Sequence, residues 1–109
     1  MPEWIAYYQE NRENALSSIG NMALSSSYQK ELSLWVNRYL DPIGLFRTIN
    51  AKREEATDPF ERIRLQAERD LEFTILLANK KDRSGSNILL LESNLLLLFN
   101  LMLAHMKNS

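Results

Sequence analysis

Hydrophobic residues recur along the chain at intervals of three and four positions, which is the spacing of one face of an α-helix. The first such stretch covers residues 2–18, and Gly20 provides a suitable end. Proline favours the first helical position, because the amide hydrogen that it lacks would have no partner there. The apolar face of this predicted helix consists of Trp4, Tyr8, Ala15 and Ile19, with Ile5 and Leu16 beside it.

A second periodic stretch begins after three consecutive serines. Ser26 followed by Gln29 has the spacing of a capping box, in which two side chains bond backbone amides of the first turn. The apolar positions that follow, and that we assign to the core or a dimer interface, are Leu32, Trp35, Val36, Tyr39, Ile43 and Phe46, with Ile49 next in phase. Asp41-Pro42 interrupts them, and such a pair ordinarily ends one helix and caps the next. Because the apolar phase continues past Pro42, we favour one long helix over residues 27–53, kinked at Pro42, over two helices.

The clearest helix start in the chain lies at residues 57–61. Asp58 is expected to cap this helix, Pro59 to take its first position, and Glu61 to reach back toward the cap. We predict a helix to about residue 81, with Lys80 and Lys81 at its negative end. Its core stripe is Phe60, Ile63, Ala67, Leu71, Thr74 and Ala78. A turn is predicted at residues 83–86, after which Ser86 or Asn87 would cap a last helix.

That last helix, predicted over residues 86–106, is apolar on nearly every side. Leucine supplies 19 of the 109 residues, and nine of these lie between positions 89 and 103. A helix of this kind must be covered on several sides, which the rest of so small a chain can barely do. We therefore predict one all-helical domain, residues 1–109, with dimerising helices at 1–83 and the leucine-rich helix against a second chain. A membrane-spanning tail is the less favoured interpretation, because Glu92, Asn94 and Asn100 would be costly in hydrocarbon.

The composition excludes several kinds of site. The chain has no cysteine, so disulfides, thiolate metal sites and a cysteine nucleophile are ruled out, and the single histidine, His105, cannot build a metal site alone. No phosphate-binding glycine loop, nucleophile elbow or zinc-protease motif occurs. We therefore expect neither an enzyme nor a cofactor. The N-terminal residues lack the features of a signal peptide, and the absence of cysteine fits a reducing cytoplasm.

The net charge of −1 conceals an uneven distribution of charges. Five bases and two acids give residues 30–53 a charge of +3, whereas five bases and eight acids give residues 54–82 a charge of −3. At about 100° per residue, Lys30, Arg38 and Lys52 fall roughly opposite the core stripe. Arg62, Arg69 and Lys80 align on the next predicted helix. These are either ordinary solvated faces or a basic track that follows a phosphate backbone.

Two stretches of the chain resemble a known viral family. The matching residues are Met1-Pro2, Ala6, Gln9-Glu10, Ser27-Tyr28-Gln29, Val36-Asn37-Arg38, Leu40-Asp41, Phe46, Thr48-Ile49-Asn50 and Ala51-Lys52. Their order and approximate spacing over residues 1–53 are similar to those of the nodavirus suppressors of RNA interference, the "B-two" proteins. The resemblance implies an antiparallel helical homodimer with a four-helix core. It also implies sequence-independent binding of double-stranded RNA in the host cytoplasm, which shields long and small interfering RNA from silencing proteins of the host.

The resemblance also assigns individual residues. Arg38 matches a basic position of the family's RNA-facing long helix, and Lys52 and Arg53 match the basic end of that helix. Arg47 lies closer to the predicted core side, and Lys30 and Arg62 join the set through the charge pattern alone. A-form RNA exposes phosphates and 2′-hydroxyls across its shallow groove, so such a track can bind without reading sequence. Two features depart from the family, namely Pro42 within the long helix and the leucine-rich C-terminal segment.

Two other hypotheses remain open on the sequence. The chain could be a helical protein-interaction module, such as a secretion-system rod subunit, chaperone or adaptor, with its last helix as the partner surface. The Asp58-Pro59 start followed by Gln66 resembles type III secretion rod and needle subunits. The third hypothesis is a tail-anchored membrane protein.

Overall fold

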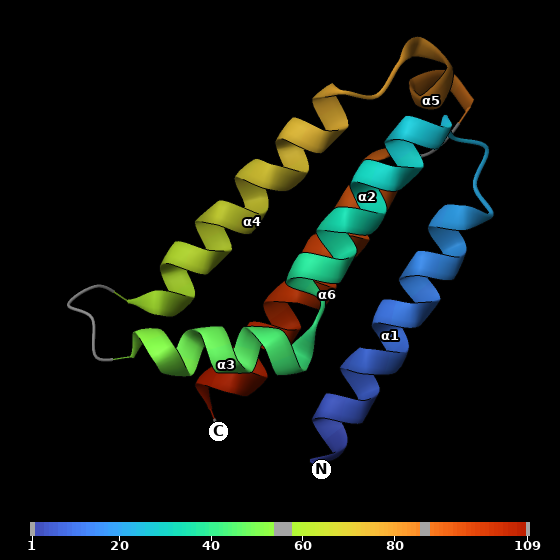
Figure 1. The fold of residues 1–109 in the computed structure, drawn as a ribbon. Helices are drawn as coiled ribbons and strands as arrows, with labels where there is room; N and C mark the ends of the chain where they lie inside the picture. The colour runs from blue at the N-terminus through green and yellow to red at the C-terminus, as the bar shows by residue number, and fades with distance from the viewer. Residues whose placement is uncertain (1, 54–57, 86–87, 109) are drawn as a thin grey trace.

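Six helices make up the part of the chain that the structure describes, and no strand occurs there. The computed structural model describes residues 2–53, 58–85 and 88–108. The helices are α1 (Glu3–Gly20), α2 (Ser26–Tyr39), α3 (Pro42–Lys52), α4 (Pro59–Leu76), α5 (Lys80–Gly85) and α6 (Ile88–Lys107). The predicted all-helical class is therefore confirmed. The long helices α1, α2, α4 and α6 alternate in direction, α3 lies across one end of them, and α5 lies at the other (Figure 1).

The core lies where α6 meets the other long helices. Phe99 of α6 is fully buried, and its ring meets those of Trp35 and Tyr39 of α2, with centroids 6.1 and 5.8 Å away. The indole Nε1 of Trp35 donates a hydrogen bond of 2.9 Å to the carbonyl of Ala67 in α4. The predicted core positions of α2 are all buried inside this one chain, namely Leu32, Trp35, Val36 and Tyr39. The chain therefore covers the apolar face of α2 with its own helices.

The prediction of one long helix across Pro42 is wrong. Helix α2 ends at Tyr39 and α3 begins at Pro42, which occupies its first position. Between them Asp41 has φ −95° and ψ 100°, the extended conformation that a following proline favours. Helix α3 turns across the end of the bundle (Figure 1). Its buried residues are consequently Pro42, Leu45 and Ile49, whereas Ile43 and Phe46 of the predicted stripe are only half-buried.

The capping box that we predicted at Ser26 and Gln29 is also wrong, because the residue that caps α2 lies one position earlier. Ser25 is the N-cap of α2, and its Oγ accepts a hydrogen bond from the amide of Tyr28. The side chain of Gln29 instead donates to the carbonyls of Ile19 and Met22, at 3.0 and 2.9 Å. These bonds tie α2 to the end of α1, which runs two residues beyond its predicted end.

Helix α4 begins where the sequence predicted and ends earlier. Asp58 accepts a hydrogen bond of 3.0 Å from the amide of Phe60, as expected of the cap. The predicted core stripe of α4 is buried except for Phe60, which is half-buried. The helix ends at Leu76 rather than near residue 81, and α5 occupies most of the predicted turn at 83–86. Asn79 and Asp82 stabilise this break, because the side chain of each accepts a hydrogen bond from the backbone amide of the other. The predicted caps Ser86 and Asn87 lie outside the described residues.

Candidate nucleic-acid interface

The bases of α2 lie on its outer face, as the sequence predicted. Lys30 is exposed, and the side chain of Arg38 is 73% exposed. An Nη1 atom of Arg38 lies 3.6 Å from a carboxylate oxygen of Asp70 in α4. The same carboxylate accepts a hydrogen bond from the hydroxyl of Tyr39. Burial, together with this bond, raises the pKa of Tyr39 to about 12. Arg38 is thus accessible, but an anion that binds it competes with Asp70.

Helix α3 carries cations and no carboxylate. Arg47 and Arg53 are exposed and Lys52 is half-buried, so Arg47 is more accessible than its predicted place near the core suggested. The guanidinium of Arg53 lies 5.8 Å from the centre of the Phe60 ring, which holds it against the start of α4. Glu54 and Glu55, the next residues along the chain, lie outside the described residues. The bases of α3 therefore lie in its C-terminal half, from Arg47 to Lys52, with Arg53 directly after the helix.

The predicted track is not a single straight line of bases. Lys30 and Arg38 lie on α2, whereas Arg47, Lys52 and Arg53 lie on α3, which runs across the end of α2 (Figure 1). Arg62 is exposed near the start of α4, the helix that follows α3. Lys80 is part of α5 rather than α4, so the predicted line of Arg62, Arg69 and Lys80 along one helix is wrong. The accessible bases instead gather around α3 and continue onto α2.

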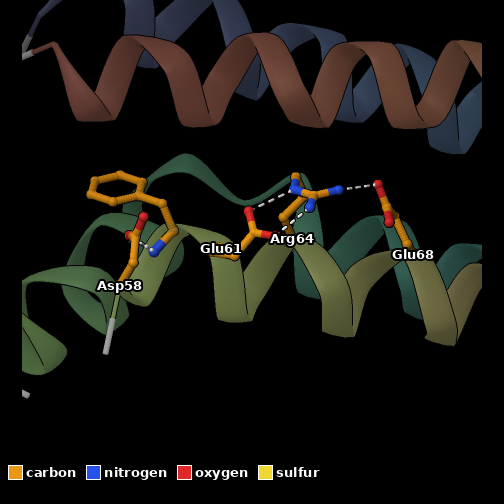
Figure 2. A network of polar contacts seen from close by, with 5 residues as sticks. Asp58, Glu61, Arg64 and Glu68 are labelled. Carbon is orange, nitrogen blue, oxygen red and sulfur yellow. Dashed lines mark hydrogen bonds and ion pairs between the residues drawn. The ribbon is translucent and has the colours of Figure 1, made fainter. Parts of the chain in front are cut away.

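One arginine that the charge count included is committed to neighbours on its own helix. Figure 2 shows Arg64 of α4 between Glu61 and Glu68. Its Nη1 lies 2.8 Å from Glu68, and its Nε and Nη2 donate to the two oxygens of Glu61. The hydrogen bonds from Arg64 hold the pKa of the Glu61 carboxyl below its ordinary value. Arg64 thus stabilises the first turns of α4 rather than offering a free charge to a ligand.

Beside Arg38 runs a groove of about 550 Å³ between α2 and α4. Leu34 and Phe73 are 52% and 63% exposed along it, and Trp35 and Tyr39 form its floor. The pattern of charges along the sequence did not predict these apolar neighbours of Arg38, because Leu34 and Phe73 belong to two different helices. The groove beside Arg38 thus combines exposed hydrophobic side chains with the carboxylates of Glu31 and Asp70.

Helix α6 leaves a second, uncharged groove on the opposite side of the core. Its exposed leucines include Leu89, Leu90, Leu97 and Leu101. A groove of about 660 Å³ between α1 and α6 is lined by the last three of these together with Tyr7 and other uncharged residues. By length and composition, α6 is the one helix among the described residues that could also cross a membrane. One side of it is nevertheless buried in the core, at Leu95, Phe99, Met102 and Met106.

Comparison with known proteins gives no relative: no family model, no curated protein and no solved structure matches the chain. Within residues 2–53, 58–85 and 88–108, no three metal-ligating side chains gather in one place. The arrangement offers two chemically distinct surfaces, a basic one around α3 and the outer face of α2, and an apolar one between α1 and α6.

Proposed function

We propose that this protein binds double-stranded RNA without regard to sequence and thereby shields it from host silencing. The observation that carries the proposal is the group of three cations at the C-terminal end of α3, Arg47, Lys52 and Arg53. The one carboxylate at the start of this helix, Asp41, lies 3.9 Å from Arg12. The exposed bases of α2 extend it. A patch of positive charge can contact phosphates and 2′-hydroxyls, which are the same in every sequence. The resemblance to the nodavirus suppressors over residues 1–53 points to the same ligand.

The overall charge of −1 is compatible with this role. The carboxylates of α4 are partly neutralised locally, since Glu61 and Glu68 share Arg64. Interactions between exposed charges are screened over about 8–10 Å at physiological ionic strength. A phosphate backbone that lies along α3 is therefore affected mainly by the nearby cations, Arg47 and Arg53 foremost.

A gel-shift titration with a duplex RNA of about 25 base pairs tests the proposal, because that length exceeds what a small domain covers. We expect binding that weakens steeply with salt, is indifferent to sequence and is stronger for RNA than for DNA duplexes. Substituting Arg38, Arg47 and Arg53 together by alanine should weaken binding about 10- to 100-fold and flatten the salt dependence. Lys80→Ala, at the other end of the bundle, should bind as the wild type does, whereas Arg47→Ala, which removes the same single charge, should bind more weakly.

Two outcomes would contradict the proposal. One is the absence of any shift at low salt. The other is equal loss of affinity in the triple variant and in Lys80→Ala, which would indicate non-specific attraction rather than a defined surface. Circular dichroism must show unchanged helicity in both variants, as expected for exposed side chains.

A helical protein-interaction module is the second candidate, and the uncharged groove between α1 and α6 favours it. If this second function is correct, the protein does not bind RNA. Substitutions at Leu97 rather than at Arg47 then remove its association with a protein partner. Removal of the whole C-terminal helix would not test it, because Phe99, Met102 and Met106 of α6 are fully buried in the core.

A further inference from the structure

Helix α6 carries two apolar seams with the spacing of a coiled coil. The inner seam consists of Leu95, Phe99, Met102 and Met106, and packs inside the chain. The outer seam consists of Leu90, Asn94, Leu97 and Leu101, and lines the groove beside α1. Both follow steps of four, three and four residues, the spacing at which one helix repeatedly meets another. The three leucines of the outer seam remain 47–59% exposed beside α1.

Helix α1 forms the other wall of the groove with the same spacing. Its contributing residues include Tyr7, Asn11, Asn14 and Ser18, which also follow steps of four, three and four. Tyr7 is 54% exposed. The amide nitrogen of Asn11 donates a hydrogen bond of 2.8 Å to the backbone carbonyl of Tyr7 one turn earlier. The groove is thus a seat for one further helix, bordered by two parallel rows of side chains.

The chemistry of the groove favours a protein helix over lipid. Asn11, Asn14 and Asn94 all line it. Amide side chains are costly in hydrocarbon, but between packed helices they hydrogen-bond one another. A single asparagine within a leucine seam also fixes the register of a helix pair. Lys and Arg, which a helix lying on an anionic membrane surface would present, do not occur among the lining residues.

The absence of charge further favours a second copy of this chain as the occupant. A two-fold interface brings the same surface of each copy together, so a charge near the axis would face its own copy, and an unbalanced charge elsewhere would find no partner. None of the described residues that line the groove is charged, which makes this face compatible with itself. A stable interface takes about 800 Å² from each partner. That is about an eighth of the 6872 Å² surface of this chain, an area that an 18- and a 20-residue helix side by side can supply.

The structure leaves this face as the place for a dimer contact. The stripe of α2 that the sequence assigned to a dimer core is buried within the single chain, with Leu32, Trp35 and Val36 at most 3% exposed. We propose that two copies associate through the α1–α6 groove, with the outer seam of α6 from each copy seated in the groove of the other. This dimer contact goes beyond the proposed function, and it does not require RNA.

Sedimentation equilibrium over a range of protein concentrations tests the dimer in the absence of RNA. We expect the wild type to dimerise, and Leu97→Lys to weaken the dimer at least about tenfold, because each interface would then bury two unpaired charges. Leu89→Lys is the matched control, since Leu89 is 75% exposed on the same helix and does not line the groove. It should dimerise as the wild type does. Circular dichroism monitors folding, which neither exposed position should affect.

Cross-linking gives an independent measure of proximity, because the chain has no cysteine of its own. Single-cysteine variants Asn94→Cys and Leu97→Cys should form covalent dimers on mild oxidation at much lower protein concentration than Leu89→Cys. A monomeric wild type at all concentrations would overturn the proposal. So would a Leu97→Lys dimer as strong as the wild type. Binding of a monomeric wild type to phosphatidylcholine vesicles, lost in Leu97→Lys, would assign the face to a lipid surface instead. RNA binding that persists without dimerisation would separate this failure from a failure of the proposed function.

Discussion

Phe99→Ala should be among the most destabilising single changes in this chain. Phe99 lies at the centre of the core, is fully buried, and touches the rings of Trp35 and Tyr39. Truncating such a side chain removes its buried apolar surface and leaves a cavity between α6 and α2, a loss of about 3–5 kcal/mol. A domain of this size typically unfolds with about 5–15 kcal/mol, so a large part of its stability would disappear.

The expected change is large enough to measure in two ways. In urea, where the free energy of unfolding falls by about 1–3 kcal/mol per molar, the midpoint should drop by about 2 M. The melting temperature should fall by about 15–30 °C, since each kcal/mol shifts it by about 4–8 °C in a domain near this size. Protein concentration must be the same in all samples, because dimerisation adds to apparent stability.

Leu89→Ala is the matched control for this prediction. Leu89 belongs to the same helix and is 75% exposed, so its truncation should change stability by no more than about 0.5 kcal/mol. Equal midpoints for Phe99→Ala and Leu89→Ala would refute the packing argument. That result would mean that α6 does not close the core of the folded chain, as it would not in a membrane-anchored tail.

Two further predictions concern polar groups. Burial opposes the charge of Asp82, yet hydrogen bonds from the amides of Ser25 and Asn79 and from the Ser25 hydroxyl outweigh it and lower its pKa below the ordinary value of 3.8. Its stabilising effect is therefore present above pH 3.8 and lost as the pH falls through the folded pKa. The wild type and Asp82→Asn should differ in urea midpoint at neutral pH and converge as the pH falls below 3.8. A constant difference would contradict this. Tyr28 and Tyr39 form a matched pair, because burial raises the pKa of both to about 12. Only Tyr39 donates a hydrogen bond to a carboxylate. The buried hydroxyl of Tyr28 has no hydrogen-bond partner in the described part of the chain. Tyr39→Phe should lower the free energy of unfolding in urea by about 1–2 kcal/mol, and Tyr28→Phe should hardly change it. Each variant should also lose one ionisation near pH 12 in an absorbance titration at alkaline pH. The reverse order of stabilities would count against the hydrogen-bond assignment.

Local sequence was sufficient for the features that depend on neighbours in the chain. Asp58 and Pro59 predicted the start of α4 correctly, because capping and a fixed proline φ act within one turn. The stripe Leu32, Trp35, Val36 and Tyr39 was also predicted correctly, since helical periodicity alone places these side chains on one face. The candidate bases were predicted to be exposed for the same reason, and Lys30 and Arg38 are exposed.

Tertiary contacts decided what local pattern left ambiguous. Each of three consecutive serines could cap the helix. Ser25 does so because its amide and hydroxyl donate hydrogen bonds to the carboxylate of Asp82, 57 residues away. The apolar phase across Pro42 fitted a kinked helix equally well, but burial of Pro42, Leu45 and Ile49 against the end of the bundle selects a separate α3. That turn also decides where the bases of α3 lie relative to those of α2 (Figure 1). Sequence alone determined which helices are amphipathic. The fold determined which of their faces remain uncovered, because that depends on how many neighbouring helices the chain itself can supply.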